Sequence, residues 1–495
     1  MSEYNGLLFL GFCSSAPMRV LWPDWFYYRV IAPRVPVGSR DEALYAPCGT
    51  RKIEAALLGY GFGEDEVLVT TPENLRSVVG PETRIIGITA NDPLGMGPAT
   101  TTFCGIIKRK SYLASEFEAL VTDPWLRRWG AKVIVGGPGA WQFEKRPDLR
   151  RKWKIDHVVI GEGEHVVPPL FERIIRGERA PEIIYGNVVE NIPSIKRATI
   201  CGIIEVARGC GRGCRFCLPT LQRLRCLPID QVLEEVGINV REGRTGIVLH
   251  AEDILRYNAN SWQVNPKAVE ELFHRVKTFP GVERVGISHF SLASVASAPE
   301  VVRHVSEILE LGTEEQPWIA GQTGIETGSP RLARIHMINK SKPFPPEKWP
   351  EVIEQAYGIL SDNLWIPAST LIIGLPGETD DDIARSIELV DDLKRYPGLI
   401  VPLFLVPQGG MQGGKPFRIE DANECVYQLL YACWEYNIRW LLHLTDLYVL
   451  RSRRTSLIAK MLFGSFIISL RTILAPKMEK EIQTWLVRDR EGLIS

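Results

Sequence analysis

Three cysteines stand close together in the segment EVARGCGRGCRFCLPT, and their spacing suits metal chemistry. Cys210, Cys214 and Cys217 form a C-x3-C-x2-C pattern, interleaved with glycines that permit a tight loop. Three thiolates are one ligand short of a closed zinc or iron–sulfur site. Two hypotheses therefore stay open: a structural zinc site completed by Cys201 or Cys226, or a 4Fe–4S cluster with one iron open to a small molecule.

The other seven cysteines are scattered along the 495 residues, at Cys13, Cys48, Cys104, Cys201, Cys226, Cys425 and Cys433. Disulfide frameworks are typical of short secreted chains. We therefore interpret these seven as ordinary core or surface thiols.

The cysteine triad resembles the signature of the radical S-adenosylmethionine (radical SAM) enzymes. Phe216 stands just before the last cysteine, where that family commonly has an aromatic residue. The resemblance implies that Cys210, Cys214 and Cys217 hold a 4Fe–4S cluster. It also implies that the open iron binds the amino and carboxylate groups of the methionine part of S-adenosylmethionine (SAM).

From residue 203 onward, six strand-like runs alternate with helix-like stretches. The runs cover 203–209, 246–252, 284–290, 322–327, 369–378 and 399–408. Most are continuously apolar or β-branched, as strands covered on both faces are. The alternation predicts βαβ units with a parallel sheet. The resemblance implies a partial barrel of six βα units, with its chemistry at the carboxyl ends of the strands.

Polar residues follow the second and third of these strands. Glu252 and Asp253 occupy the place where the family accepts a hydrogen bond from the methionine amino group, and a carboxylate suits an ammonium. A solvated acidic loop is the alternative. Ser288 is expected to face the nucleoside or the substrate. His289 and Tyr257 are weaker candidates for a catalytic role, because such single residues are more often part of the core.

The segments after the fourth and fifth strands complete the expected SAM site. GQTGIETGSPRLAR resembles the family's segment that contacts the ribose or the carboxylate of SAM. The resemblance implies Glu326 as the acceptor for the ribose hydroxyls and Arg331 or Arg334 as the partner of the carboxylate. STLIIGLPGETDDD resembles the segment that lies against adenine, with Ile373 and Gly374 as the contacting residues.

Residues 1–175 carry a separate strand–helix pattern. Candidate strands cover 5–12, 66–71, 84–92, 132–139 and 157–164. The pattern predicts a doubly wound, Rossmann-like α/β domain, which binds ligands at the carboxyl ends of its strands. A nucleotide-binding domain or a purely structural one is compatible with the same pattern.

This region resembles the cobalamin-binding domain that precedes the barrel in one large subclass of radical SAM enzymes. The matching segments are EAALLGYGF, NDPLGMGPATTTF, VIVGGPGAWQF and VVIGEGEHVVP. They assign to the cobalamin region Asp92, Gly136, Gly137, Pro138, Gly161 and Glu162. The Asp-x-His-x-x-Gly pattern, which supplies a histidine below the cobalt in some of these domains, does not occur, so a lower histidine ligand is not expected.

The remaining boundaries follow from composition. We predict a proline-containing linker over 176–200, the barrel over 201–410 and a mainly helical region over 411–495. The last region is apolar and aromatic-rich, with basic residues interspersed. We interpret it as a helical cap, or as a channel or interfacial helix for an apolar substrate. With the domain order, it is similar to the archaeal tetraether-lipid ring synthases, which implies a lipid substrate.

The balance of positive and negative residues bears on the class of macromolecule that this protein binds. Lys plus Arg is 58 and Asp plus Glu is 59, so a nucleic-acid partner is not expected. The N-terminal sequence MSEYNGLLFLGF lacks the basic segment of a secretory signal, and no run of 18 apolar residues occurs. We expect a cytoplasmic protein, with peripheral contact to a membrane as an additional hypothesis.

The resemblance as a whole implies a cobalamin-dependent radical SAM enzyme. Such an enzyme cleaves SAM reductively to a 5′-deoxyadenosyl radical, which takes hydrogen from an unactivated carbon. It needs a low-potential electron donor such as ferredoxin or flavodoxin. We expect carbon–carbon bond formation, by ring formation or methylation, on an isoprenoid lipid-like substrate. The alternatives are a methyltransferase for a peptide, a natural product or tRNA, and a non-catalytic zinc or cobalamin sensor.

Overall fold

The computed structural model describes residues 2, 13–20, 22–218, 221, 223–411 and 413–445. The chain divides into two compact units, and each is described by itself. The first comprises Met1–Gly211, Leu218–Ala251 and Leu272–Gly286, and the second comprises Arg212–Cys217, Glu252–Glu271 and Ile287–Ser495. The division therefore falls inside the cysteine loop and inside the predicted 201–410 barrel.

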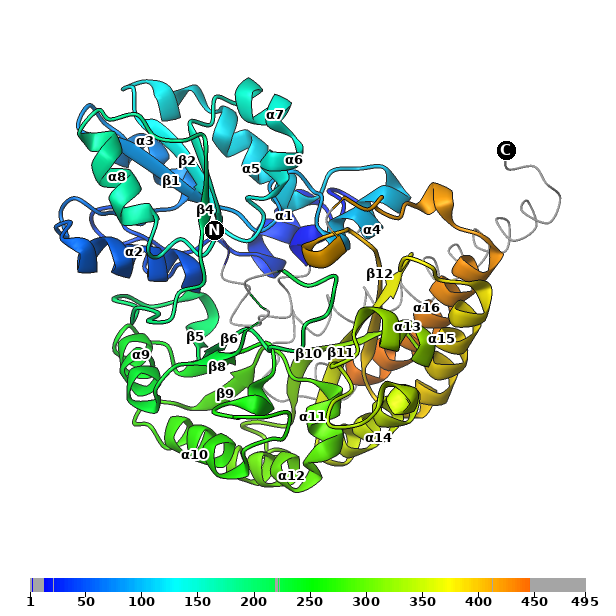
Figure 1. The fold of residues 1–495 in the computed structure, drawn as a ribbon. Helices are drawn as coiled ribbons and strands as arrows, with labels where there is room; N and C mark the ends of the chain where they lie inside the picture. Colours follow the sequence, from blue (N-terminus) through cyan, green and yellow to red (C-terminus); the bar gives the residue numbers. More distant parts are fainter. Residues whose placement is uncertain are drawn as a thin grey trace. The chain divides into compact units, whose positions relative to one another are not determined.

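A four-stranded parallel sheet lies in the N-terminal part of the first unit (Figure 1). Its strands lie side by side in sequence order: β1 (Ile85–Thr89), β2 (Lys132–Gly136), β3 (His157–Gly161) and β4 (Ile183–Gly186). The helices of this part are α1 (Asp24–Phe26), α2 (Cys48–Tyr60), α3 (Leu75–Val78), α4 (Pro98–Ile107), α5 (Tyr112–Thr122), α6 (Gln142–Lys145), α7 (Pro147–Lys152) and α8 (Val167–Ile175). The predicted parallel βα pattern is confirmed here.

Three details differ from the predicted pattern. The segment 66–71 is not a strand; Thr70 alone makes an isolated antiparallel bridge, to Glu42. The predicted linker 176–200 contains β4. This strand was not predicted, because it is only four residues long and its sequence shows no periodicity. The predicted strand 5–12 lies outside the described residues.

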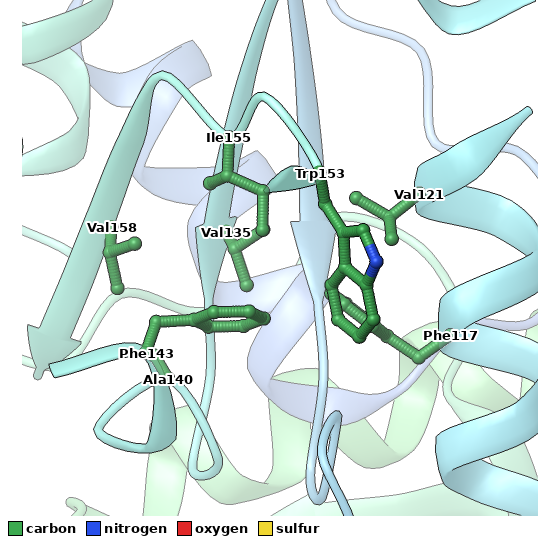
Figure 2. Close-up of a cluster of buried hydrophobic side chains, with 8 residues drawn as sticks. All are labelled: Phe117, Val121, Val135, Ala140, Phe143, Trp153, Ile155 and Val158. Carbon is green, nitrogen blue, oxygen red and sulfur yellow. The ribbon is translucent and has the colours of Figure 1, made fainter. Parts of the chain in front are cut away.

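The core on one face of this sheet is apolar and aromatic (Figure 2). It consists of Phe117, Val121, Val135, Ala140, Phe143, Trp153, Ile155 and Val158. The rings of Phe117, Phe143 and Trp153 have centroids 5.7 to 6.2 Å apart. Each buried aromatic side chain contributes about 2 kcal/mol through the hydrophobic effect. Because Ala140 lies near the end of the loop between β2 and α6, this core also fixes the end of that loop.

A second sheet contains β5 (Ile203–Glu205), β8 (Gly246–His250) and β9 (Arg284–Ile287), with β5 parallel to β8. Next to it in sequence, β6 (Ala207–Arg208) and β7 (Arg225–Cys226) form an antiparallel hairpin. The cysteine loop is the connection between these two strands. Helices α9 (Ile229–Arg241) and α10 (Pro266–Lys277) follow in this part of the chain.

The second unit is built around a parallel sheet of β10 (Ile319–Glu326), β11 (Trp365–Ile373) and β12 (Leu399–Phe404). Its helices are α11 (Leu292–Ser297), α12 (Pro299–Ile308), α13 (Pro330–His336), α14 (Trp349–Asp362), α15 (Asp380–Asp392) and α16 (Glu424–Thr445). All six strands predicted beyond residue 203 are thus present, and the α/β class with parallel sheets is confirmed.

Helix α16 covers β12 (Figure 1). The Asn437 side chain accepts from the N–H of Ile400 (2.7 Å) and donates to its carbonyl (2.6 Å), and the Tyr436 hydroxyl donates to the carbonyl of Tyr396 (2.9 Å). This part of the predicted C-terminal region is therefore a covering helix; residues 446–495 lie outside the described residues. Within the described part, no helix is long and apolar enough to cross a membrane.

Candidate active site

The cysteine loop begins with a backbone that only glycine can adopt without strain. Gly209 has φ +76°, and a Cβ there would lie 2.2 Å from the carbonyl oxygen of Arg223. Gly211 and Gly213 both have φ +69°. The predicted role of these glycines in a tight loop is confirmed.

The loop offers three thiols of different exposure. Cys214 is buried, whereas Cys210 and Cys217 are partly exposed. In the described ranges, no three side chains of histidine, cysteine, aspartate or glutamate are placed so as to hold a metal ion. The donor chemistry nevertheless fits a 4Fe–4S cluster, since thiolates are its usual ligands and one loop supplies three of them.

The cysteines outside the loop have the surroundings of core residues. Cys201 is buried in an apolar cluster, and Cys226 lies on β7 opposite Ala207. Burial raises the pKa to about 12 for Cys48, Cys104 and Cys433. Thiols with such pKa values stay protonated near neutral pH and are poor metal ligands.

Arg208 anchors the chain two residues before Cys210. Within the first unit its guanidinium contacts Glu162 (2.9 Å), Glu164 (2.8 Å) and Glu205 (2.6 Å). Burial opposes the charge on the guanidinium, but the bonds and charges of these carboxylates outweigh burial and raise the pKa of Arg208. The approach to the triad is therefore fixed by a buried ionic network.

Glu162 is fully engaged in this network. Arg225 donates two hydrogen bonds of 2.7 Å to its carboxylate, and the N–H of Val189 donates a third of 2.8 Å. Burial alone would raise the pKa of Glu162, but the bonds from Arg225 and Val189 and the charge of Arg208 lower it. The carboxylate of Glu162, which the resemblance assigned to the cobalamin region, joins the loop after β3 to the β6–β7 hairpin.

Arg212 anchors the loop between Cys210 and Cys214. In the second unit its Nη1 donates to three carbonyls, those of Asn339 (3.1 Å), Lys340 (3.0 Å) and Lys342 (3.0 Å). Its Nη2 donates to the Asp253 carboxylate (3.0 Å) and the Ser294 hydroxyl (2.9 Å). The side chain is 3% exposed, so this charge is held inside the protein.

Asp253 differs from the predicted role. Besides Arg212, its carboxylate accepts from the Ser294 hydroxyl (2.8 Å) and the N–H of Ser291 (3.1 Å), and its side chain is completely buried. Asp253 therefore holds the cysteine loop instead of facing a ligand. Its neighbour Glu252 is partly exposed.

Glu326 lies on the half-exposed face of the second unit's sheet. Gln322 and Gly324 of β10 and Thr370 of β11 are half-buried, whereas alternate residues are buried. The Glu326 carboxylate accepts from Lys340 Nζ (2.7 Å) and from the Thr370 hydroxyl (3.1 Å). The predicted ligand residue is itself buried, 7% exposed, within a polar group that the sequence did not reveal.

In the segment predicted to lie against adenine, the space beside Gly374 is filled by the ring of Phe417. Gly374 has φ +91°, and a Cβ there would lie 2.4 Å from the ring of Phe417. The Gly374 N–H donates to Glu378 (2.7 Å), and the side chain of Ile373 is completely buried. The half-buried residue that packs beside Phe417 is Ile372.

Arg331 is held away from the predicted role by an ion pair. Its guanidinium contacts Asp382 and donates to the carbonyl of Gly377 (2.6 Å). Ser329 caps α13 by accepting from the N–H of Leu332 (3.3 Å), as the Ser-Pro sequence predicts for a helix start. Ser329 is therefore the N-cap of α13. Arg331 is paired with Asp382 at the protein surface.

The residues after β9 lie beside β10. The N–H of Gln322 donates to the carbonyl of Ser288 (2.7 Å), and His289 forms a parallel bridge with Gln322. The Ser288 side chain and Tyr257 are buried, and His289 is half-buried. Of these candidates, His289 alone is partly accessible.

The remaining predicted cobalamin residues share the carboxyl edge of the four-stranded sheet. Asp92 follows β1 and accepts from the N–H of Gly97 (2.9 Å) and from Gln142 Nε2 (2.6 Å). Gly136 ends β2, and Pro138 is exposed in the loop beyond it. The structure thus brings these loops to one edge, as the parallel pattern predicts.

Two glycines at this edge serve close packing within the chain. A Cβ on Gly137 would lie 2.8 Å from Thr89 and 3.0 Å from the backbone of Ala90. A Cβ on Gly161 would lie 2.4 Å from the carbonyl oxygen of Gly186. The close approaches observed at these two glycines are those of neighbouring segments of the chain.

Comparison with known proteins supports this architecture. Residues 204–390 match the model of the Radical SAM superfamily. A tRNA-2-methylthio-N(6)-dimethylallyladenosine synthase of Agrobacterium fabrum is 26% identical over 285 residues, covering 54% of this chain and 57% of the relative. The same-named protein of Clostridioides difficile is 25% identical, covering 56% of each chain. The chain thus spans little more than half the length of these curated relatives.

Solved structures of the methyltransferase TsrM from Kitasatospora setae share the fold. One, with cobalamin and a [4Fe-4S] cluster, has a TM-score of 0.52 at 14% identity, covering 74% of this chain and 71% of TsrM. Another, with tryptophan and a SAM analogue, has a TM-score of 0.52 at 15% identity, covering 74% and 72%. This chain therefore contains a radical SAM domain, over residues 204–390.

Proposed function

We propose that this chain is a cobalamin-dependent radical SAM enzyme that forms a bond to an unactivated carbon. One observation carries the proposal: the three-cysteine loop lies in a matched radical SAM domain that a parallel α/β sheet precedes in the chain. A solved protein holding cobalamin and a 4Fe–4S cluster has a similar fold over 74% of this chain. When bound, the cluster would supply the electron that cleaves SAM to a 5′-deoxyadenosyl radical.

The chain's own residues would hold and orient the cofactors. The thiolates of Cys210, Cys214 and Cys217 would ligate three irons, and Glu252 would accept from the SAM amino group. Glu326 would accept from the ribose hydroxyls, at the half-exposed sheet face. The edge formed by the loops after β1, β2 and β3 would receive cobalamin.

The test is anaerobic reconstitution with iron, sulfide and cobalamin. The proposal expects visible iron–sulfur absorbance, release of 5′-deoxyadenosine from SAM, and bound cobalamin. Cys214→Ala should abolish 5′-deoxyadenosine release, while Cys425→Ala, a control thiol outside the loop, should not. Release of 5′-deoxyadenosine by Cys214→Ala at the wild-type rate would contradict the proposal, as would a zinc-containing protein without iron–sulfur absorbance.

For the substrate we propose an apolar, isoprenoid lipid-like molecule. Its support is the apolar, aromatic and arginine-containing sequence over 425–475, of which the structure describes the part up to Thr445. Peripheral membrane contact and a ferredoxin- or flavodoxin-like electron donor belong to the same proposal. Product masses test it: ring closure removes two hydrogens, and methylation adds one CH2.

A second candidate is a methyl or methylthio transferase for another substrate. The TsrM structures favour a small natural-product substrate, because one of them contains tryptophan. The curated relatives are named as tRNA methylthio enzymes, although the near-neutral charge of this chain does not favour a polyanion. A gain of CH2S on tRNA, with no change in an isoprenoid lipid, would select this candidate.

A further inference from the structure

Arg212 occupies an unusual position for a buried charge, inside the metal-binding motif itself. Its guanidinium uses both terminal nitrogens on five acceptors from three segments, which follow β8, lie in α11 and follow α13. A buried ion pair is weak evidence for net stability, because desolvation offsets the attraction. The donors of a planar guanidinium point in fixed directions, however, so the hydrogen bonds of Arg212 define the conformation of the segments that it joins.

The segment 212–217 is seated on the second unit by two further contacts. The N–H of Arg215 donates to the carbonyl of His336 (2.9 Å). Phe216 packs against an apolar cluster that includes Leu332, Leu375 and Phe417. The positions of Cys214 and Cys217 within the second unit therefore follow from the seating of this segment, and Arg212 supplies its polar contacts.

The segment 339–342, whose carbonyls accept hydrogen bonds from Arg212, also supplies a hydrogen bond to Glu326. Arg212 donates to the backbone carbonyl of Lys340, and the ammonium of the same Lys340 donates to Glu326 (2.7 Å). A Cβ on Gly324 would lie 1.9 Å from the Glu326 carboxylate and 2.6 Å from Lys340 Nζ, so glycine makes room for this pair. Lys340 thus connects Arg212 of the cysteine loop to the carboxylate of Glu326.

We propose that Arg212 is a positioning residue that couples the cysteine loop to the SAM-binding carboxylate Glu326 through residues 339–342. The proposal rests on the proposed function, because it needs a cluster and SAM on these residues. Because the Arg212 side chain is 3% exposed, it would act through the backbone that it fixes, and not by contact with the cluster or SAM. Loss of Arg212 should therefore weaken SAM binding and alter the environment of the cluster while iron is retained.

The test uses the reconstituted full chain. Arg212→Met/Asp253→Asn removes both buried charges, so that no unpaired carboxylate remains. Arg223→Met, which removes an exposed charge of the same loop outside the segment 212–217, is the control. The readouts are iron content, the electron paramagnetic resonance spectrum of the reduced cluster with and without SAM, and the Kd of SAM by calorimetry. We expect normal iron content, a lost spectral response to SAM and a Kd raised about tenfold in the double variant, with wild-type values in Arg223→Met.

A double variant with the wild-type spectra and SAM Kd would overturn the proposal. If the double variant does not fold, Lys340→Met is the second test, because it keeps the backbone carbonyl that accepts from Arg212 and removes the bond to Glu326. A raised SAM Kd with normal iron content in Lys340→Met supports the coupling, and an unchanged Kd refutes it. A wild-type chain that binds no cluster or no SAM refutes the proposed function instead.

Discussion

Arg225 and Glu162 form a buried, two-pronged ion pair, with both hydrogen bonds 2.7 Å long. Arg225 lies on β7 at one end of the cysteine loop, and Glu162 directly follows β3. The pair therefore ties the base of the loop to the edge of the four-stranded sheet within the first unit.

Removal of the Glu162 carboxylate should destabilise the protein strongly. Glu162→Ala leaves Arg225 buried without its partner and is expected to lower the free energy of unfolding by about 3 kcal/mol. Urea denaturation followed by circular dichroism measures this change. The control is Glu190→Ala, which breaks the exposed pair with Arg223 and should change stability by less than about 0.5 kcal/mol. Equal effects of the two variants would contradict the prediction.

Glu378 should make stability depend on pH. Burial raises its pKa in the folded chain to about 7, from an ordinary value of 4.5, against a lowering contribution from the Gly374 N–H. The unfolded chain therefore releases the proton at a lower pH than the folded chain does. Stability should fall by about 3 kcal/mol as the pH rises from about 4.5 to 7.

Glu378→Gln is the matched variant for this pH effect, because the amide oxygen still accepts from Gly374. The difference between wild type and variant in unfolding free energy, measured at pH 5 and pH 7.5, isolates the contribution of Glu378. An identical pH slope in the two proteins would show that Glu378 titrates normally.

Two glycines of one turn allow a controlled test of packing. Gly374 and Gly377 both have positive φ, but only a Cβ on Gly374 meets another residue, the ring of Phe417. Gly377→Ala should cost about 1 kcal/mol through backbone strain, and Gly374→Ala about 3 kcal/mol. Adding Phe417→Ala to Gly374→Ala should recover part of the difference between them. Equal costs in thermal unfolding would exclude the collision with Phe417.

Arg331 and Glu326 should differ in their effect on SAM binding. Arg331 is half-exposed and paired with Asp382, so Arg331→Met is expected to leave the Kd of SAM unchanged. Glu326→Gln removes the charge of a buried carboxylate that is held by Lys340 and Thr370, and it should raise the Kd about tenfold. Calorimetric titration of both reconstituted variants measures this. A raised Kd in Arg331→Met would restore the carboxylate-binding role predicted from the sequence.

The strands and the cysteine loop were predictable because their signals are local. Mainly apolar or β-branched runs mark β8, β11 and β12, and alternating glycines mark the loop around Cys214. The strand β4 was not predictable, since four residues carry no period and its pairing partner β3 lies more than twenty residues earlier in the chain.

The polar partners of the site were not predictable from the same signals. Arg212 reaches Asp253 and Lys340 across 41 and 128 residues of sequence, and nothing in the spacing marks such a contact. Asp253 stands beside Glu252 in the sequence, and only burial separates the structural carboxylate from the accessible one. Phe417 likewise fills the space at Gly374 from more than forty residues away.

The interleaving of the two units constrains how this protein can be made. Because residues up to Gly286 belong to the first unit and Arg212–Cys217 to the second, no single cut yields either unit as one continuous fragment. During synthesis the first unit cannot be completed before its last segment has left the ribosome. Heterologous production should therefore use the uninterrupted chain, and a truncation at the 176–200 region would discard strands that the first unit requires.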